Sequence, residues 1–259
     1  MQPIYDSIGS TYCATRRADP GIARELARLV GVKDASCFLD VACGTGNYTC
    51  ALADFGGHWF GVDVSEVMLK QAAAEDPGIR WTLASADNLP FQDRSFDGAT
   101  CCLAIHHFPE LASAFREVWR VLDNGRFILF TALPDQMCEY WLSHYFPEMM
   151  RRSAQKMPSR QNTVAALQSV GFVVEDLIPF HVSDQLQDLF LYSGKQRPEA
   201  YLDPTVRANI SSFALLCTDE ELNEGLRALQ ADLNSGTFDS VVKCYSSSAG
   251  DYAYVVARK

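Results

Sequence analysis

The chain has no long hydrophobic segment. In its 259 residues no apolar run approaches the roughly 20 residues that a membrane-spanning helix needs. The first residues, Met1–Asp6, lack a basic region followed by an apolar one, which is the pattern of a secretory leader. We therefore expect no membrane span and a cytoplasmic location.

Positive charge is also scarce. The sequence has 22 Lys and Arg against 32 Asp and Glu, a formal net charge of -10 at pH 7. Proteins that bind DNA or RNA neutralise phosphates with clustered Lys and Arg, so this balance argues against a nucleic-acid partner. The apolar fraction of 48% is that of an ordinary globular domain.

The cysteines do not follow a metal-binding pattern. None of the nine forms a C-x-x-C pair, and no Cys/His cluster has zinc-finger spacing. Several, such as Cys37 and Cys43, fall in or beside apolar segments, where a free thiol packs as a small hydrophobe. We expect reduced thiols and no metal site.

What the sequence does contain is a glycine-rich loop after an apolar segment. Leu39–Val41 is typical of a buried strand, Ala42–Gly46 of a tight loop, and a helix is expected from about Asn47. Backbone N–H groups and a helix N-terminus then face a small anionic or polar ligand. The next apolar segment ends in Asp63, and an acid at the end of such a strand can bind ribose hydroxyls. Together these features predict a site for a nucleoside cofactor.

Strands and helices alternate through the first half of the chain. Strands are expected at 37–41, 58–63, 81–86, 96–103 and 126–133, with a turn at Asp123–Gly125 before the last of them. Right-handed crossovers convert such alternation into a parallel sheet covered by helices. The predicted fold is α/β, a doubly wound, mostly parallel, seven-stranded Rossmann-like sheet with a largely helical cap inserted near the C-terminus.

The whole chain is expected to form a single domain. The cofactor-binding core is expected over about 20–133, a substrate cap over about 135–165 and 184–240, and closing strands at about 172–180 and 251–257. The cap is dense in aromatic residues, including Tyr140–Phe146 and Phe190–Tyr192. These side chains either line an apolar ligand pocket or form the core between the cap and the sheet.

The glycine loop does not match the dinucleotide fingerprint. That fingerprint, G-x-G-x-x-G, has a third glycine where this chain has Thr49, or Asn47 in the other alignment. A nicotinamide-dependent oxidoreductase is therefore a disfavoured alternative.

Four segments, in this order and spacing, resemble the class I S-adenosylmethionine-dependent methyltransferases. They are Asp40–Gly46, Gly61–Asp63, Ala86–Phe91 and Ser95–Asp97. The resemblance is closest to the small-molecule branch that includes ubiquinone and menaquinone methyltransferases.

Two positions depart from that family's pattern. Ala42 replaces the first glycine of the loop, and its methyl group is compatible with an extended backbone. Asp123–Gly125 stands where the family commonly has Pro-Gly-Gly, and Asn tolerates left-handed turn geometry.

The resemblance implies that S-adenosyl-L-methionine is the cofactor, and it assigns roles to matching positions. Asp63 is expected to accept both ribose hydroxyls. Asp87, with Asn88 beside it, is expected to accept from the adenine amino group, and Asp40 to lie near the methionyl amine. The other implied contacts come from the loop, from apolar residues flanking the adenine and from the end of the fourth strand: Ala42, Gly44, Gly46, Val64, Met68 and Leu103.

The N-terminal segment also resembles the family's tyrosine-rich lead-in, which can fold over the cofactor. Tyr12 is then a candidate aromatic lid, and Arg17 a candidate clamp for the cofactor carboxylate. The alternative for Arg17 is an ordinary surface arginine.

His106 and His107 are the candidate catalytic residues. They follow the fourth strand, at the edge where the methyl acceptor should approach, and a histidine can remove a proton from a hydroxyl or phenol acceptor. The alternative is that one of them only caps the loop or bonds a backbone carbonyl.

The sequence thus predicts a methyltransferase that acts on a small organic molecule, with the oligomeric state open. Two alternatives stay open: an arsenite or thiol acceptor, and a non-catalytic protein that only binds the cofactor. The first alternative requires several cysteines that converge near the cofactor. Cys101 and Cys102 are a poor pair for this, because neighbours in a strand point to opposite faces.

Overall fold

The fold is built around one seven-stranded sheet. The computed structural model describes residues 15–245 and 249–259. The strands lie in the order β3-β2-β1-β4-β5-β7-β6. Their bounds are β1 Cys37–Val41, β2 His58–Asp63, β3 Arg80–Leu83, β4 Phe96–Cys102, β5 Leu122–Thr131, β6 Val173–Phe180 and β7 Tyr252–Arg258.

Within the described sheet, β7 runs opposite to the six other strands. β1 pairs in parallel with β2 and β4, β2 with β3, and β4 with β5, whereas β7 is antiparallel to both β5 and β6. The direction in which successive strands are added reverses between β1 and β4, which are neighbours near the middle of the sheet. This arrangement confirms the predicted mostly parallel, Rossmann-like sheet, and it brings the carboxyl ends of β1, β2, β3 and β4 to one edge.

The sheet is buried on both faces. Along β5, Ile128 and Phe130 pack into one hydrophobic cluster, and Phe127 and Leu129 into the other. The first cluster includes residues of α3 (Pro20–Val30) and α4 (Asn47–Ala53), and the second includes residues of α6 (Leu111–Val121) and α10 (Arg160–Ser169). Helix α5 (Glu66–Glu75) packs against β2 and β3.

The predicted helix limits are set by local capping. Asp19 accepts hydrogen bonds from the backbone N–H groups of Gly21 and Ile22 at the start of α3, and Gly31 ends that helix with a φ of 79°. Ser65 caps α5 through its hydroxyl, which accepts from the N–H of Met68. The loop before α5 is thereby held at the carboxyl edge of the sheet.

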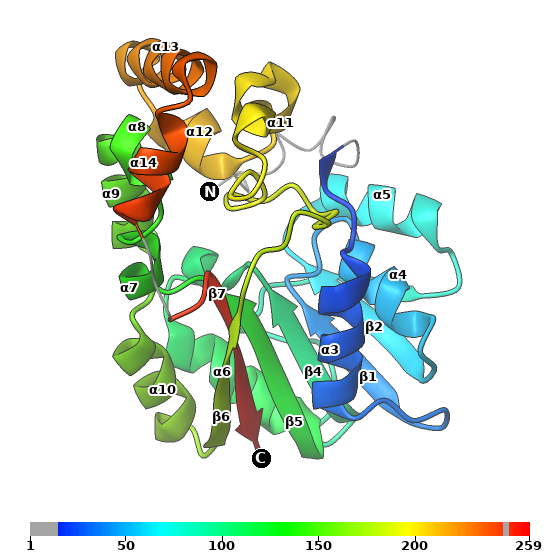
Figure 1. Cartoon of the computed structure of the whole chain (residues 1–259). Helices are drawn as coiled ribbons and strands as arrows, with labels where there is room; N and C mark the ends of the chain where they lie inside the picture. Colours follow the sequence, from blue (N-terminus) through cyan, green and yellow to red (C-terminus); the bar gives the residue numbers. More distant parts are fainter. Residues whose placement is uncertain (1–14, 246–248) are drawn as a thin grey trace.

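A second group of helices gathers over that edge, as Figure 1 shows. Three of them follow β5 in the chain, and the other five lie between β6 and β7. They are α7 (Pro134–Met137), α8 (Leu142–Tyr145), α9 (Pro147–Lys156), η3 (Pro198–Leu202), α11 (Pro204–Ala208), α12 (Ser211–Leu216), α13 (Asp219–Ser235) and α14 (Phe238–Lys243).

The aromatic residues of this helical layer are core. Tyr140, Trp141, Phe146 and Tyr192 are each at most 1% exposed, and they pack together with side chains of the sheet. None of them lines the large cavity described below. Of the two alternatives for this aromatic-rich stretch, the structure therefore supports the core.

One sequence expectation about the sheet is wrong. Asp123–Gly125 forms no turn, because β5 begins at Leu122, directly after α6. The pairing of β4 with β5 shifts register between Phe96 and Gly98, and the backbone of Gly125 lies against Asp97 there. A Cβ on Gly125 would lie 1.9 Å from the Asp97 carbonyl oxygen, so the glycine serves close strand approach, not a turn.

The segment Trp81–Ala86 also differs from expectation, since β3 covers only Arg80–Leu83. The following residues leave the sheet as a loop, and this loop lines the cavity.

Among the described residues, no helix is both long and apolar enough to cross a membrane.

Candidate cofactor and acceptor site

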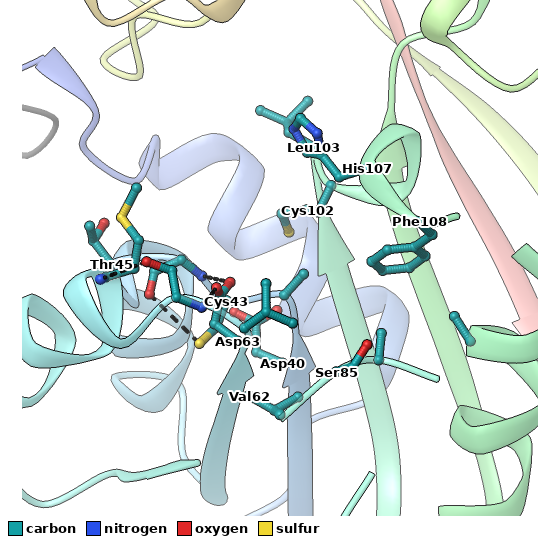
Figure 2. Close-up of a pocket in the computed structure, with 18 of the residues that line it drawn as sticks. Asp40, Cys43, Thr45, Val62, Asp63, Ser85, Cys102, Leu103, His107 and Phe108 are labelled. Atoms are coloured by element: carbon teal, nitrogen blue, oxygen red, sulfur yellow. Dashed lines mark hydrogen bonds between the residues drawn. The ribbon is translucent and has the colours of Figure 1, made fainter. Parts of the chain in front are cut away.

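A cavity of about 550 Å³ lies at the carboxyl edge of the sheet. Its volume falls within the range of small-molecule sites. Residues after β1, β2, β3 and β4 line it, together with Arg16 before α3 and Asp188 from the segment between β6 and η3. Figure 2 shows the side chains of Asp40 and Asp63 on one side, and those of Leu103, His107 and Phe108 on another.

Most of the predicted site residues meet at this cavity. Its lining includes nine of them: Asp40, Ala42, Gly44, Asp63, Val64, Met68, Asp87, Leu103 and His107. Gly46, Asn88, His106 and Arg17 are not among the lining residues. Tyr12 lies outside the described residues.

Gly44 and Gly46, the two glycines of the loop, have different structural roles. Both have a positive φ, 56° at Gly44 and 75° at Gly46. A Cβ on Gly44 would meet no protein atom within 4 Å, and Gly44 lines the cavity. A Cβ on Gly46 would lie 2.4 Å from the ring of Trp81. Gly44 thus keeps the cavity open, and Gly46 is required by packing beneath the loop.

Ala42 corrects another expectation. Its backbone is not extended but left-handed, with a φ of 57°, and Leu103 at the end of β4 has a φ of 54°. Such conformations are uncommon for residues with a side chain and cost free energy. Both residues line the cavity, so two of the three non-glycine residues with a positive φ in the described chain lie at this site.

Asp63 ties the first two loops together. One carboxylate oxygen accepts a hydrogen bond from the backbone N–H of Gly44 (2.9 Å), and the other accepts from that of Ser65 (2.8 Å). The carboxylate is therefore fixed at the end of β2, at the wall of the cavity.

Asp40 is buried beneath the glycine loop. Its carboxylate accepts hydrogen bonds from the hydroxyls of Thr49 (2.6 Å) and Thr100 (3.0 Å). Burial raises the pKa of Asp40 to about 6, although both hydroxyls act in the opposite direction. A charge that is this weakly solvated interacts strongly with any cation placed beside it.

The loop that carries Asp87 is held from behind by helix α6. Arg120 donates to the carbonyl oxygens of Leu89 (2.9 Å) and Phe91 (2.7 Å). Its partner Glu117 accepts from the backbone N–H of Leu89 (2.9 Å). The ion pair between Arg120 and Glu117 therefore fixes the loop that follows β3.

The two histidines occupy different positions. His107 lines the cavity, whereas His106 does not. Burial lowers the pKa of His106 to about 3, and its Nδ1 has no hydrogen-bond partner within the described part of the chain. Burial and the positive charge of Lys156 also lower the pKa of His107. Both rings are neutral near pH 7.

Cys101 and Cys102 face opposite sides of β4, as expected for neighbours in a strand. Cys101 belongs to the cluster packed on α6, and Cys102 lines the cavity. In residues 15–245 and 249–259, no group of three or more His, Cys, Asp or Glu is arranged to hold a metal ion.

Comparison with known proteins identifies the family. Residues 39–130 match the model of the methyltransferase domain. The whole chain resembles the crystal structure of a putative methyltransferase from an antibiotic biosynthesis pathway of Anabaena variabilis. The two are 32% identical with a TM-score of 0.83, over 95% of this chain and 99% of the other. The chain belongs to the class I S-adenosylmethionine-dependent methyltransferases.

Curated relatives of this methyltransferase match its sheet region. An uncharacterized methyltransferase, YcgJ, of Bacillus subtilis is 35% identical over 128 residues, 45% of this chain and 46% of its own length. A demethylmenaquinone methyltransferase of Staphylococcus epidermidis is 38% identical over 106 residues, 39% of this chain and 44% of its own length. The chain thus spans less than half the length of these relatives.

Two residues that line the cavity were not predicted by the sequence analysis, Arg16 and Asp188. Arg17 was expected at the cofactor, but its side chain is exposed, and the neighbouring Arg16 lines the cavity instead. Because Arg16 and Arg17 are adjacent and identical, the sequence does not indicate which of them faces the cavity. Asp188 reaches the site from a segment far along the chain, so no local pattern indicates it.

Proposed function

We propose that this methyltransferase binds S-adenosyl-L-methionine in the cavity at the carboxyl edge and transfers its methyl group to a small apolar or aromatic molecule. One observation carries the proposal: a single cavity is lined by Asp63 at the end of β2, Asp87 after β3 and Gly44 in the loop after β1. These are the acid and glycine positions that a nucleoside cofactor requires at such an edge.

The lining residues fit the cofactor chemically. Asp63 is oriented by two backbone hydrogen bonds and can accept the ribose hydroxyls. Val64 and Met68 offer apolar surface beside Asp87 for an adenine ring, and Asp40 offers a buried carboxylate to the methionyl amine. Gly44 has space for a ligand where a side chain would otherwise stand.

When bound, the cofactor supplies an electrophilic methyl group on a sulfonium that is a good leaving group. The chain has to hold the acceptor in line and exclude water, and alignment can contribute about 7–11 kcal/mol to lowering the barrier. Cys102, Leu103, Phe108 and Pro109 line the cavity on the β4 side. Their largely apolar surface suits an apolar or aromatic acceptor, and the relative named demethylmenaquinone methyltransferase is consistent with that class.

His107 is the proposed proton acceptor for a hydroxyl or phenol substrate. It lines the cavity, and its neutral ring has a nitrogen lone pair that can accept a proton, although burial makes it a weaker base than a solvated histidine. His106 contacts the His107 ring, with 4.0 Å between ring centroids, and is proposed to orient it. Replacing His107 by Gln should lower kcat about 10²- to 10⁴-fold with a hydroxyl acceptor. Affinity for S-adenosylhomocysteine should stay unchanged, and equal kcat values would refute the role.

The first test is calorimetric titration with S-adenosylmethionine and S-adenosylhomocysteine, with NAD as the negative control. Asp63→Asn should abolish binding of both sulfur nucleosides, whereas Asp54→Asn, an exposed acid outside the cavity, should bind like wild type. Binding of NAD alone would contradict the proposal. Cofactor binding without methyl transfer to any hydroxyl, phenol, amine or quinol in an acceptor panel would favour a non-catalytic cofactor-binding protein.

A further inference from the structure

The charged residues that line the described wall of the cavity are mostly acidic. Among the described lining residues, Arg16 is the only lysine or arginine, and five are acids: Asp40, Asp63, Asp87, Glu110 and Asp188. A ligand carboxylate that enters this acidic surrounding needs a cationic partner. Arg16 can be that partner, since a guanidinium pairs with carboxylates in a fixed geometry and can bind more than one of them.

Arg16 is held by a carboxylate from the segment between β6 and β7. Asp188 is 1% exposed, and its two oxygens accept from Nε (2.5 Å) and Nη2 (3.3 Å) of Arg16. The hydroxyl of Tyr48 in α4 donates to the same carboxylate (3.1 Å). Burial, and then the charge of Asp188, raise the pKa of Tyr48 well above its usual range, so that hydroxyl stays protonated as a donor.

The backbone around Asp188 is attached to the same region. The N–H of Leu189 donates to the carbonyl oxygen of Thr15 (3.1 Å), and the N–H of Gln187 donates to the carboxylate of Asp19 (3.1 Å). The segment 187–189 therefore lies on the residues that lead into α3. It comes from the long insertion between β6 and β7, which in Figure 1 reaches across the sheet edge to α3 and α4.

We propose that Asp188 is a positioning residue that orients Arg16 to bind the carboxylate of the cofactor's amino-acid end. The inference rests on the proposed function. Asp188 does not touch the cofactor; it fixes the direction of the guanidinium and holds the insertion over that end of the cavity. Recognition of the cofactor carboxylate then depends on the insertion, whereas recognition of the nucleoside and of the methionyl amine depends on the sheet and its loops.

The test compares two ligands, S-adenosylhomocysteine, which has the amino-acid end, and methylthioadenosine, which lacks it. Asp188→Asn should raise the Kd of S-adenosylhomocysteine by about ten- to a hundredfold, the size of a lost charge-assisted hydrogen bond. The Kd of methylthioadenosine should change less than about twofold. Arg16→Gln should show the same selective loss, and the double variant should be no worse than either single one, because the two residues act as a unit.

A matched control separates positioning from general loosening of the insertion. Asp251 is 3% exposed, pairs with Lys195 and accepts from the N–H of Val182 (2.8 Å), so it anchors the same insertion to β7 away from the cavity. Asp251→Asn should leave the Kd ratio of the two ligands unchanged. If Asp188→Asn folds poorly, Tyr48→Phe removes one donor to the carboxylate and should give a smaller loss, again only for S-adenosylhomocysteine.

Equal weakening of both ligands by Asp188→Asn would overturn the inference, because it would mean a purely structural role. A loss in Asp188→Asn without one in Arg16→Gln would also overturn it, because Asp188 would then bind the cofactor itself. If the wild type binds S-adenosylhomocysteine and neither variant changes its Kd, the inference is refuted but the proposed function is not. Wild-type protein that binds neither ligand refutes the proposed function together with it.

Discussion

Asp63 and Gly44 are joined by a hydrogen bond, in which the backbone N–H of Gly44 donates to the Asp63 carboxylate over 2.9 Å. One interaction thus sets the position of the acid after β2 against the loop after β1. Both residues line the same cavity, and a displacement of the Gly44 N–H is expected to change the position of the carboxylate that accepts from it. The two sequence motifs are therefore one structural unit.

The two loop glycines predict different phenotypes. Gly44→Ala adds a methyl group that meets no protein atom within 4 Å. We expect a stability loss of about 1–2 kcal/mol from the left-handed backbone. We also expect at least about tenfold weaker binding of S-adenosylhomocysteine, because the methyl group occupies cofactor space.

Gly46→Ala places its methyl group 2.4 Å from the Trp81 ring. Overpacking adds about 1–3 kcal/mol to the same backbone cost, so this variant should be the less stable of the pair. Urea unfolding and calorimetry distinguish them. A Gly46→Ala protein more stable than Gly44→Ala would contradict the assigned roles.

The affinity for S-adenosylmethionine should depend on pH through Asp40. The pKa of Asp40 in the folded protein is raised to about 6, so the carboxylate becomes protonated as the pH falls through that value. A cationic amine binds the ionised form better, and we expect affinity to drop by up to about tenfold per pH unit below pH 6.

Asp40→Asn is the control for this effect, since it keeps the shape and removes the titration. Its affinity should be lower at pH 7.5 and nearly flat between pH 5 and 7.5. Calorimetry across that range in matched buffers makes the measurement. A wild-type profile with no change near pH 6 would show that Asp40 does not sense the cofactor's charge.

The folding stability of the wild type should show the opposite sign. Because the pKa of Asp40 is raised on folding, its contribution to stability is fully present below its usual value and is lost as the pH rises through about 6. The free energy of unfolding of Asp40→Asn should lack this decline. Urea titrations at pH 4.5 and 7 compare the two proteins, and parallel changes in both would contradict the assigned pKa.

Arg120 should control the adenine side of the site without contacting the cofactor. Arg120→Met removes its hydrogen bonds to the carbonyl oxygens of the loop after Asp87, which should cost about 1–3 kcal/mol of stability. We expect a higher KM for S-adenosylmethionine with little change in kcat. Arg116→Met, an exposed arginine on the same helix, is the matched control. Equal KM values for the two variants would refute the role.

The left-handed backbone of Ala42 predicts a second pair of variants. Ala42→Gly removes the backbone strain at φ 57° but increases the freedom of the unfolded chain, so stability should change by less than about 1 kcal/mol. Ala42→Val places a β-branched residue in this conformation and should cost about 1–3 kcal/mol. Thermal unfolding decides, and a Val variant as stable as the Gly variant would disprove the strain.

Much of the sheet and its cofactor edge was predictable, because its signals are local. Asp19, Ser65 and Gly31 end or begin helices through contacts within a few residues, and β1 and β2 have the bounds that the sequence predicts. The glycine loop and Asp63 lie at strand ends, and parallel topology brings strand ends together.

The differences between expectation and structure have non-local causes. Asn124-Gly125 looks like a turn, yet close packing of Gly125 on Asp97 keeps it in a strand. Arg17 and Arg16 are equivalent in sequence, and only the fold buries one of them beside Asp188.

The sequence by itself determined the fold class, the methyltransferase family and the carboxylates at the strand ends, since capping, periodicity and short motifs act over a few residues. Tertiary structure alone decided which arginine faces the cavity, that the aromatic residues of the helical layer are core, and that Asp188 reaches the site. Those outcomes depend on how a long insertion packs back on the sheet. Contacts between residues 16 and 188 leave no pattern in either segment alone.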